Sequence, residues 1–223
     1  MEFFEKSNII SLFGTSGAGK SEFGLRLNSL NYGMCSIDIQ IEKAMEYLDI
    51  KGVSHWLGKP FDGRYKENEK FLLNLERNLS NEILEIAIRN AKIGAKSIID
   101  FPGSVAYLDL ALLKNLRDNS TIVYLQVDIK KNFNAIFERF RKDQDVKPFI
   151  YLDPRESNSI ITEEDFNNDE QLKEYYRNIL EYRQSVYERW ADITIPSDDL
   201  HNGKITPEQV IGMVQRHNAS NNN

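Results

Sequence analysis

Short runs of β-branched and aromatic residues recur along the chain, separated by longer amphipathic segments. The runs cover residues 8–13, 34–37, 97–101, 121–127 and 192–195. Because they do not alternate between apolar and polar residues, they are typical of strands that are buried on both faces. Helices must then cover both faces of the sheet, so the pattern predicts an α/β fold built on a five-stranded parallel sheet.

Three other segments have helical patterns. Residues 81–91 repeat apolar side chains at helical spacing, and residues 172–190 carry a broad apolar stripe. The third segment begins with Thr206 as N-cap, Pro207 in the first turn and Gln209 at the capping-box position. We therefore expect a helix in each of these segments.

The chain is expected to form one domain over residues 1–217. Its 223 residues, 41% of them hydrophobic, suffice for one substantial core and are too few for two ordinary enzyme domains. Residues 218–223 are polar and lack apolar anchors, which predicts a disordered tail. Residues 142–169 are rich in Asp, Asn, Lys and Pro. Such a long segment indicates a mobile lid, with a binding loop or a disordered insert as alternatives.

Charge and composition exclude several classes of protein. The formal net charge of −6 disfavours a protein that coats nucleic acid, since that function needs a basic face. A single cysteine, Cys35, excludes an internal disulfide and a thiolate zinc cluster. No apolar run approaches the roughly 20 residues that span a bilayer. We expect a cytoplasmic protein with no nucleic-acid or membrane partner, and the oligomeric state stays open.

A glycine-rich stretch directly follows the first apolar run. Gly14, Gly19, Lys20 and Ser21 form the Walker A pattern, in the required position between a predicted strand and a predicted helix. Glycines let backbone N–H groups curl around phosphate oxygens, and the helix N-terminus adds positive potential. Lys20 is expected to bridge the β- and γ-phosphates, and Ser21 to ligate Mg²⁺. The predicted nucleotide-binding residues are Gly14, Thr15, Ser16, Gly17, Ala18, Gly19, Lys20, Ser21 and Glu22.

Downstream segments resemble the shikimate kinases, in order and along almost the whole chain. Residues 36–42 (SIDIQIE) resemble the D-x-D-x-x-I-E segment of that family, and residues 65–69 (YKENE) resemble its F-R-x-x-E. Further matches are residues 98–105 with a strand and triple glycine, 147–150 with the lid's R-P-L-L, 183–187 with R-x-x-x-Y, and 191–195 with the A-D strand. The resemblance implies a three-layer P-loop kinase fold with helices on both faces of a five-stranded parallel sheet, a mobile lid, and ATP with Mg²⁺ as cofactors.

The chain departs from the family pattern in the region that, by resemblance, binds the acceptor. Ser36 replaces the first acid, and Lys66 replaces the arginine of F-R-x-x-E. Phe101 and Pro102 replace two of the three glycines, which leaves Gly103 as the position suited to close backbone contact. We therefore expect an acceptor other than shikimate.

By resemblance, the acceptor side consists of Asp38, Lys66, Gly103 and Arg183. Asp38 is expected mainly to orient the acceptor hydroxyl, because alignment matters more than a strong base when the transition state is loose. Lys66 could attract a carboxylate or phosphate as a point charge, or could be a solvated helix lysine. Arg183 matches an acceptor-binding arginine, with an exposed helix cation as the alternative.

The metal and the lid cations complete the expected catalytic set. Asp100 ends an apolar strand at the edge where parallel sheets bind ligands, so it could hold the magnesium shell and compensate for Ser36. The alternative is an aspartate that caps the following turn. By resemblance, Lys147 acts on the transferring phosphoryl group, while Arg139 and Arg141 lie near the adenine or phosphates. Each of these three could instead be ordinary helix surface.

These expectations lead to an ATP-dependent kinase that transfers the γ-phosphoryl group to a hydroxyl of a small polar metabolite. The acceptor could be a cyclitol, a sugar acid or a shikimate-like compound. The alternative is a nucleotide-binding regulatory protein that has lost the transfer chemistry, which the departures at Ser36, Lys66 and the triple glycine motivate.

Overall fold

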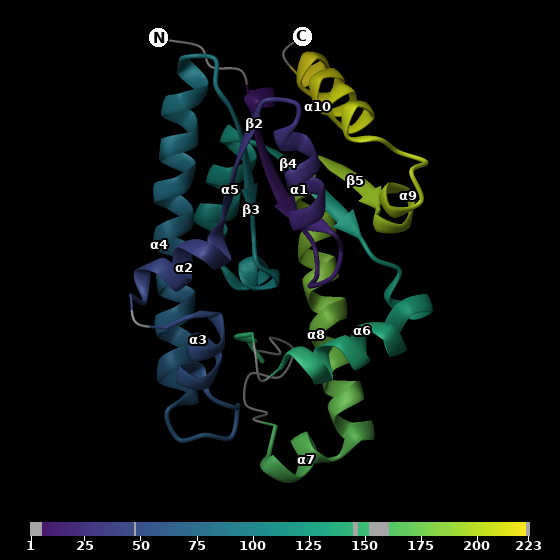
Figure 1. Cartoon of the computed structure of the whole chain (residues 1–223). Helices are drawn as coiled ribbons and strands as arrows, with labels where there is room; N and C mark the ends of the chain where they lie inside the picture. The colour runs from purple at the N-terminus through teal and green to yellow at the C-terminus, as the bar shows by residue number, and fades with distance from the viewer. Residues whose placement is uncertain (1–5, 47, 145–146, 152–160, 222–223) are drawn as a thin grey trace.

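The computed structural model describes residues 6–46, 48–144, 147–151 and 161–221. A parallel sheet of five strands in the order β2-β3-β1-β4-β5 lies at its centre (Figure 1). The strands are β1 (Ile9–Phe13), β2 (Tyr32–Ser36), β3 (Lys96–Asp100), β4 (Thr121–Gln126) and β5 (Ile193–Pro196). All five predicted strands are confirmed, as is the parallel α/β fold.

The central strand distributes its side chains to both faces of the sheet. Ile9 and Phe13 belong to one buried cluster, whereas Ile10 and Leu12 belong to the other. Successive side chains of a strand point to opposite faces, so a continuous apolar run supplies both clusters. At the middle of the strand, the buried Ser11 hydroxyl is hydrogen-bonded to the Ser120 hydroxyl, with 2.7 Å between the two oxygens.

Helices form the outer layers on both faces, which makes the fold three-layered (Figure 1). One face is covered by α4 (Tyr65–Lys92), α5 (Leu110–Asn119) and α8 (Asp169–Trp190). The other face is covered by α1 (Lys20–Asn28), α9 (Ser197–His201) and α10 (Pro207–Asn221). The other elements are η1 (Lys6–Asn8), α2 (Ile37–Ala44), α3 (Ile50–Leu57), η2 (Gly103–Tyr107), α6 (Ile129–Asp143) and α7 (Glu163–Asn167).

The helix predicted over residues 81–91 is only the last part of α4, which spans 28 residues. Upstream, the buried stripe of α4 contains the polar residues Glu76 and Ser80. These polar positions interrupt the apolar periodicity that the sequence pattern depends on. The helix extends past the sheet toward α3, so its first turns reach the region beyond the carboxyl ends of the strands (Figure 1).

The chain stays helical beyond the point where a disordered tail was predicted, so that prediction is wrong for residues 218–221. Helix α10 continues to Asn221. The Asn218 side chain is 8% exposed and donates from Nδ2 to Thr121 Oγ1 at 2.8 Å. A buried polar anchor thus replaces the missing apolar one. Residues 222–223 lie outside the described residues.

The predicted lid over residues 142–169 is described only in part, because residues 145–146 and 152–160 lie outside the described residues. Its first two residues end α6, and its last part contains α7. Between the undescribed stretches, Phe149, Ile150 and Tyr151 pack against the core. Mobility of this segment stays a prediction. Among the described helices, none has the length and hydropathy needed to cross a bilayer.

Candidate active site

A cavity of about 870 Å³ lies beyond the carboxyl ends of the strands. The P-loop, α2, α4, η2, α6 and α8 contribute to its walls. The predicted site residues that line it are Ser16, Gly17, Gly19, Lys20, Ser21, Glu22, Asp38, Asp100, Gly103, Arg139, Lys147 and Arg183. The fold therefore brings nearly all of the expected donor and acceptor residues to one cavity.

The P-loop has the backbone of a phosphate cradle. Gly14, Gly17 and Gly19 have φ angles of 152°, 83° and 85°, which L side chains rarely adopt. Helix α1 begins immediately afterwards at Lys20, so its N-terminal N–H groups face the loop. Lys20 Nζ donates to the loop carbonyls of Gly14, at 2.9 Å, and Thr15, at 3.2 Å. The glycine conformations and helix N-terminus fit the triphosphate of a nucleotide.

Arg139 lies directly over this loop. A Cβ atom on Gly17 would fall 2.3 Å from Arg139 Nη1, so a side chain at this position would displace the guanidinium from the loop. Helix α6 thus places a guanidinium at the cradle, where it could contact phosphate oxygens as a multidentate donor.

Ser21 and Asp100 meet at the predicted metal position. Ser21 Oγ donates to Asp100 Oδ2 at 2.7 Å. Asp100 is also paired with Ser36 in the register of β2 and β3, so its carboxylate stands beside the position where the family pattern has an acid. A hydroxyl and a carboxylate are the oxygen ligands that Mg²⁺ prefers, together with phosphates and water, so these residues fit the ion.

Asp38, Lys20 and Asp100 form an electrostatically coupled group. Partial burial raises the pKa of Asp38, the Lys20 ammonium opposes that rise, and the Asp100 carboxylate adds to it. Burial likewise lowers the pKa of Lys20, against the pull of Asp100 and Asp38. The Asp38 side chain is exposed to the solvent of the cavity, yet many protein atoms surround it. It therefore has a large accessible surface and still loses part of its hydration, which raises its pKa.

Arg183 is 5% exposed, so it is not the surface cation that was its alternative. Its Nη2 donates to Ile150 O at 2.9 Å, and its Nε donates to Tyr107 Oη at 3.2 Å. The guanidinium also stacks 5.1 Å from the ring centre of Tyr107 and 4.8 Å from that of Phe149. The protein thus holds this cation rigidly at the cavity wall.

Gly103 is required by Arg183. A Cβ atom on Gly103 would lie 2.8 Å from Arg183 Nη1, and the Gly103 carbonyl accepts from Tyr187 Oη at 2.7 Å. Tyr187 is fully buried in the core. The glycine that was expected to approach a ligand therefore approaches the arginine that lines the cavity.

Five predicted site residues are absent from the cavity lining: Gly14, Thr15 and Ala18 within the P-loop, and two residues outside it. Lys66 is exposed on α4 and is absent from the cavity lining, because α4 turns the preceding Tyr65 inward and successive helix residues diverge by about 100°. Tyr65 Oη donates to Glu69 at 2.8 Å and accepts from Tyr151 N at 2.9 Å. The segment that resembles F-R-x-x-E therefore anchors the chain near Tyr151.

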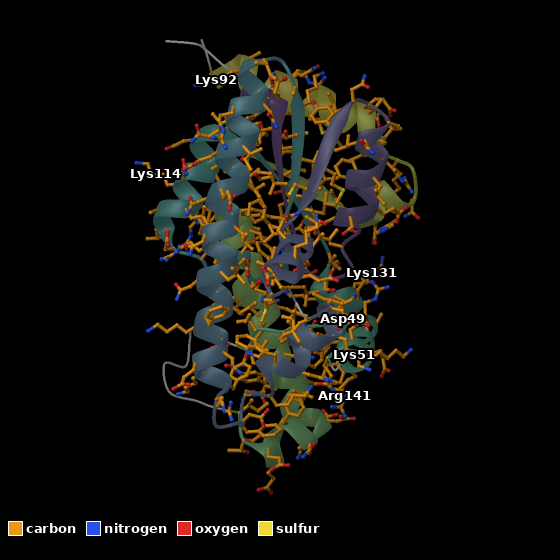
Figure 2. The ribbon with its side chains drawn as sticks, turned by 60° about the vertical axis from the view of Figure 1, so that its left-hand side comes forward. Asp49, Lys51, Lys92, Lys114, Lys131 and Arg141 are labelled. Carbon is orange, nitrogen blue, oxygen red and sulfur yellow. The ribbon has the colours of Figure 1, made fainter. Side chains whose placement is uncertain are left out.

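Arg141 is the other residue that lies away from the cavity. It is paired with Asp169 at 3.3 Å, and Figure 2 shows it at the outer surface, at the end of the molecule away from the sheet. Lys147 does line the cavity, where its Nζ lies 3.1 Å from Asp143 Oδ2.

Glu76 is not among the site residues predicted from the sequence. This residue lines the cavity and is 1% exposed, and its Oε2 accepts from Ser104 Oγ at 2.6 Å. Burial raises its pKa to about 8, against the hydrogen bond from Ser104. The available signal was an acid on the same helical stripe as the buried Leu72, Ile83 and Ala87.

Comparisons with known proteins agree with this architecture. No protein-family model matches the chain. The chain is 27% identical to a shikimate kinase of Haemophilus influenzae over 218 residues, 97% of each chain. It is also 27% identical to shikimate kinase 1 of Yersinia enterocolitica, over 95% of this chain and 98% of the relative.

Solved structures share the fold. A shikimate kinase from Bacteroides thetaiotaomicron matches with a TM-score of 0.56 and 20% identity, over 93% of this chain and 94% of the other. A shikimate kinase from Acinetobacter baumannii in complex with shikimate also gives 0.56, at 18% identity, over 96% and 91%. A dephospho-CoA kinase from Campylobacter jejuni gives 0.52 at 14% identity, over 96% and 98%. Along its full length the chain is therefore similar to shikimate kinases, and its parallel sheet and P-loop support a small-molecule kinase.

Proposed function

We propose that the enzyme transfers the γ-phosphoryl group of ATP to a hydroxyl of a small polar metabolite. One observation supports this most strongly: a single cavity is lined both by the P-loop with Arg139 and by Asp38 with Arg183. The first pair suits a nucleotide, and the second suits a compound with hydroxyl and polar groups. Candidate acceptors are cyclitols, sugar acids and shikimate-like compounds.

On the donor side, the P-loop amides and Lys20 hold the β- and γ-phosphates, and Ser21 with Asp100 holds Mg²⁺. The ion, when bound, neutralises charge on the phosphates. Arg139 contacts the nucleotide phosphates from above the loop. Lys147 stabilises charge on the transferring group, which requires that it leave its ion pair with Asp143.

On the acceptor side, Asp38 accepts a hydrogen bond from the hydroxyl that attacks the phosphorus. Its main role is alignment, because the transition state of phosphoryl transfer is loose and needs little base strength. The neighbouring Lys20 ammonium favours the ionised carboxylate. Arg183 binds a polar group elsewhere on the acceptor.

The test is ADP formation from ATP and Mg²⁺ across a panel of polyols, cyclitols, sugar acids and shikimate. Lys20→Ala should abolish acceptor-stimulated turnover, because it removes the cation that follows the phosphoryl group. Asp38→Asn should lower kcat by about 100-fold and leave ATP affinity nearly unchanged, since it disturbs only alignment. Asp118→Asn, an exposed position on α5, is the matched control.

The competing function is that of a nucleotide-binding regulatory protein. Tight ATP binding without turnover on any member of the panel would favour it. An unchanged kcat in Asp38→Asn, with turnover intact in the native chain, would instead remove Asp38 from the acceptor side and leave the kinase activity standing.

A further inference from the structure

Glu76 has an unusual environment for an acid at the wall of a cavity. Its side chain is 1% exposed, and Ser104 Oγ satisfies only Oε2. Within the described part of the chain, Oε1 is buried and has no hydrogen-bond partner. Burying a carboxylate oxygen without a donor is unfavourable, so this position is suited to a partner that supplies an N–H or O–H group.

The charges around Glu76 disfavour an acidic partner. Asp38 and Glu42, one helical turn apart on α2, line the same cavity, and Asp38 raises the pKa of Glu76. Lys66, which stands where shikimate kinases have an arginine, lies outside the cavity. The Asp38 and Glu42 carboxyl groups thus face the acceptor space beside Glu76, so a carboxylate of the acceptor would meet like charges there.

Arg183 offsets these acids only in part. Two of its nitrogens already donate within the protein, to Ile150 O and Tyr107 Oη. The other cations that line the cavity lie near the P-loop or α6, where they would bind the phosphates of the nucleotide and not the acceptor. They are Lys20, Arg139 and Lys147.

We propose that Glu76 binds a hydroxyl or amino group of the acceptor and makes the enzyme select polyols and amino polyols over carboxylic acids. This inference rests on the proposed function and narrows its acceptor class. A hydroxyl donates one hydrogen bond to Oε1. A protonated amine also favours the ionised form of Glu76, against the burial that raises its pKa, and then pairs with the carboxylate, so both groups satisfy the buried oxygen.

The experiment compares compounds that differ in one terminal group. Sorbitol, glucamine and gluconate share one carbon chain and end in a hydroxyl, an amine and a carboxylate; an inositol, an aminocyclitol and quinate form the cyclic set. Binding to the full chain with ADP and Mg²⁺ is measured by calorimetry, and phosphorylation with ATP and Mg²⁺ is measured separately. The native protein should prefer the non-acidic members by about 10-fold or more.

Glu76→Gln tests the residue itself. Glutamine preserves shape but cannot ionise, so at pH 8.5, above the Glu76 pKa of about 8, the ratio of non-acidic to acidic affinity should fall by about 10-fold, with the loss greatest for the amines. Glu67→Gln, an exposed acid on the same helix, should leave the ratio unchanged. Glu76→Asp, which keeps a carboxyl group that can ionise, should keep the ranking and provides a second variant if Glu76→Gln fails to fold.

A preference of the native protein for gluconate or quinate, or failure of every non-acidic member to bind, would overturn the inference. So would an equal loss for all members in Glu76→Gln, which is the pattern of a purely structural residue. Binding is measured without turnover, so the two proposals can fail separately. If the protein bound polyols through Glu76 but phosphorylated none of them, the kinase activity would be refuted and the role of Glu76 in binding would stand.

Discussion

At the scale of single residues, neighbours in the sequence have separate roles that the strand geometry explains. Asp100 directs its carboxylate to Ser21, whereas the next residue, Phe101, is fully buried and packs edge-on against Phe13 at 5.5 Å. Phe101 and Phe13 belong to the cluster under α4 and α8, while α1 covers the opposite face. A phenylalanine in place of a family glycine therefore enlarges the core and leaves the cavity open.

The buried Glu76 makes stability depend on pH. Its pKa is about 8 in the folded protein against an ordinary value of 4.5. Between these values the folded state keeps a proton that the unfolded state releases, so the free energy of unfolding falls as pH rises, by at most about 1.4 kcal/mol per pH unit. Glu76→Gln cannot titrate and should lack this contribution.

The measurement is urea denaturation of the ligand-free native protein and Glu76→Gln from pH 5 to pH 8.5. The stability of Glu76→Gln relative to the native protein should rise across this range. Asp38 and Asp100 titrate in both proteins, so the difference isolates Glu76. A constant difference at every pH would contradict the buried, proton-binding carboxyl.

Sequence patterns identified the residues whose chemistry depends on local backbone, and missed those that depend on packing between distant elements. The P-loop and Ser21 follow from glycine spacing at a strand–helix junction. The environment of Glu76 depends on Ser104, which lies 28 residues away, and on Arg183 from α8. The buried stripe of α4 places Glu76 on the inward face, but no local pattern shows which distant groups it meets there.

At the scale of elements, α6 shows why neighbouring arginines differ. Phe133, Phe137 and Phe140 bury one face of the helix. Arg139 lies over Gly17, whereas Arg141, two residues and about 200° further around the helix, pairs with Asp169 (Figure 2). The sequence placed both near the nucleotide because it did not fix how α6 rotates against the P-loop.

The orientation of α6 against the P-loop predicts different effects on ATP affinity for two matched substitutions. Arg139→Ala should weaken binding of ATP with Mg²⁺ by about 10-fold or more, because it removes a charge-assisted hydrogen-bond donor to the phosphates. Arg141→Ala should change the affinity by less than about twofold, because it breaks only an exposed ion pair. Calorimetric titration measures both, and equal losses in the two variants would contradict the observed orientation of α6.

At the scale of the whole molecule, the sheet could be predicted because each strand is a local apolar run. The ends of the outer helices could not be predicted in the same way, because they depend on contacts with residues far away in the sequence. Helix α10 packs across α1 and η1, on the side of the sheet that carries the second buried cluster. Its last turn is fixed by Asn218, which reaches Thr121 at the start of β4.

Asn218→Ala should therefore destabilise the whole fold without changing catalysis. The substitution removes the hydrogen bond to Thr121 and leaves a buried hydroxyl, so the free energy of unfolding should fall by about 1–3 kcal/mol. Ser220→Ala, which loses only an exposed bond to its own helix at Arg216 O, should change it by less than about 0.5 kcal/mol.

Thermal and urea unfolding compare the two variants, with kcat and KM as the functional readout. No residue of α10 lines the cavity, so both variants should keep native kinetic constants at temperatures where they are folded. If Asn218→Ala were as stable as Ser220→Ala, the end of α10 would contribute nothing to the core, as the sequence had predicted for a disordered tail. A loss confined to Asn218→Ala would instead mark Asn218 as the residue that fixes the closing helix to the sheet.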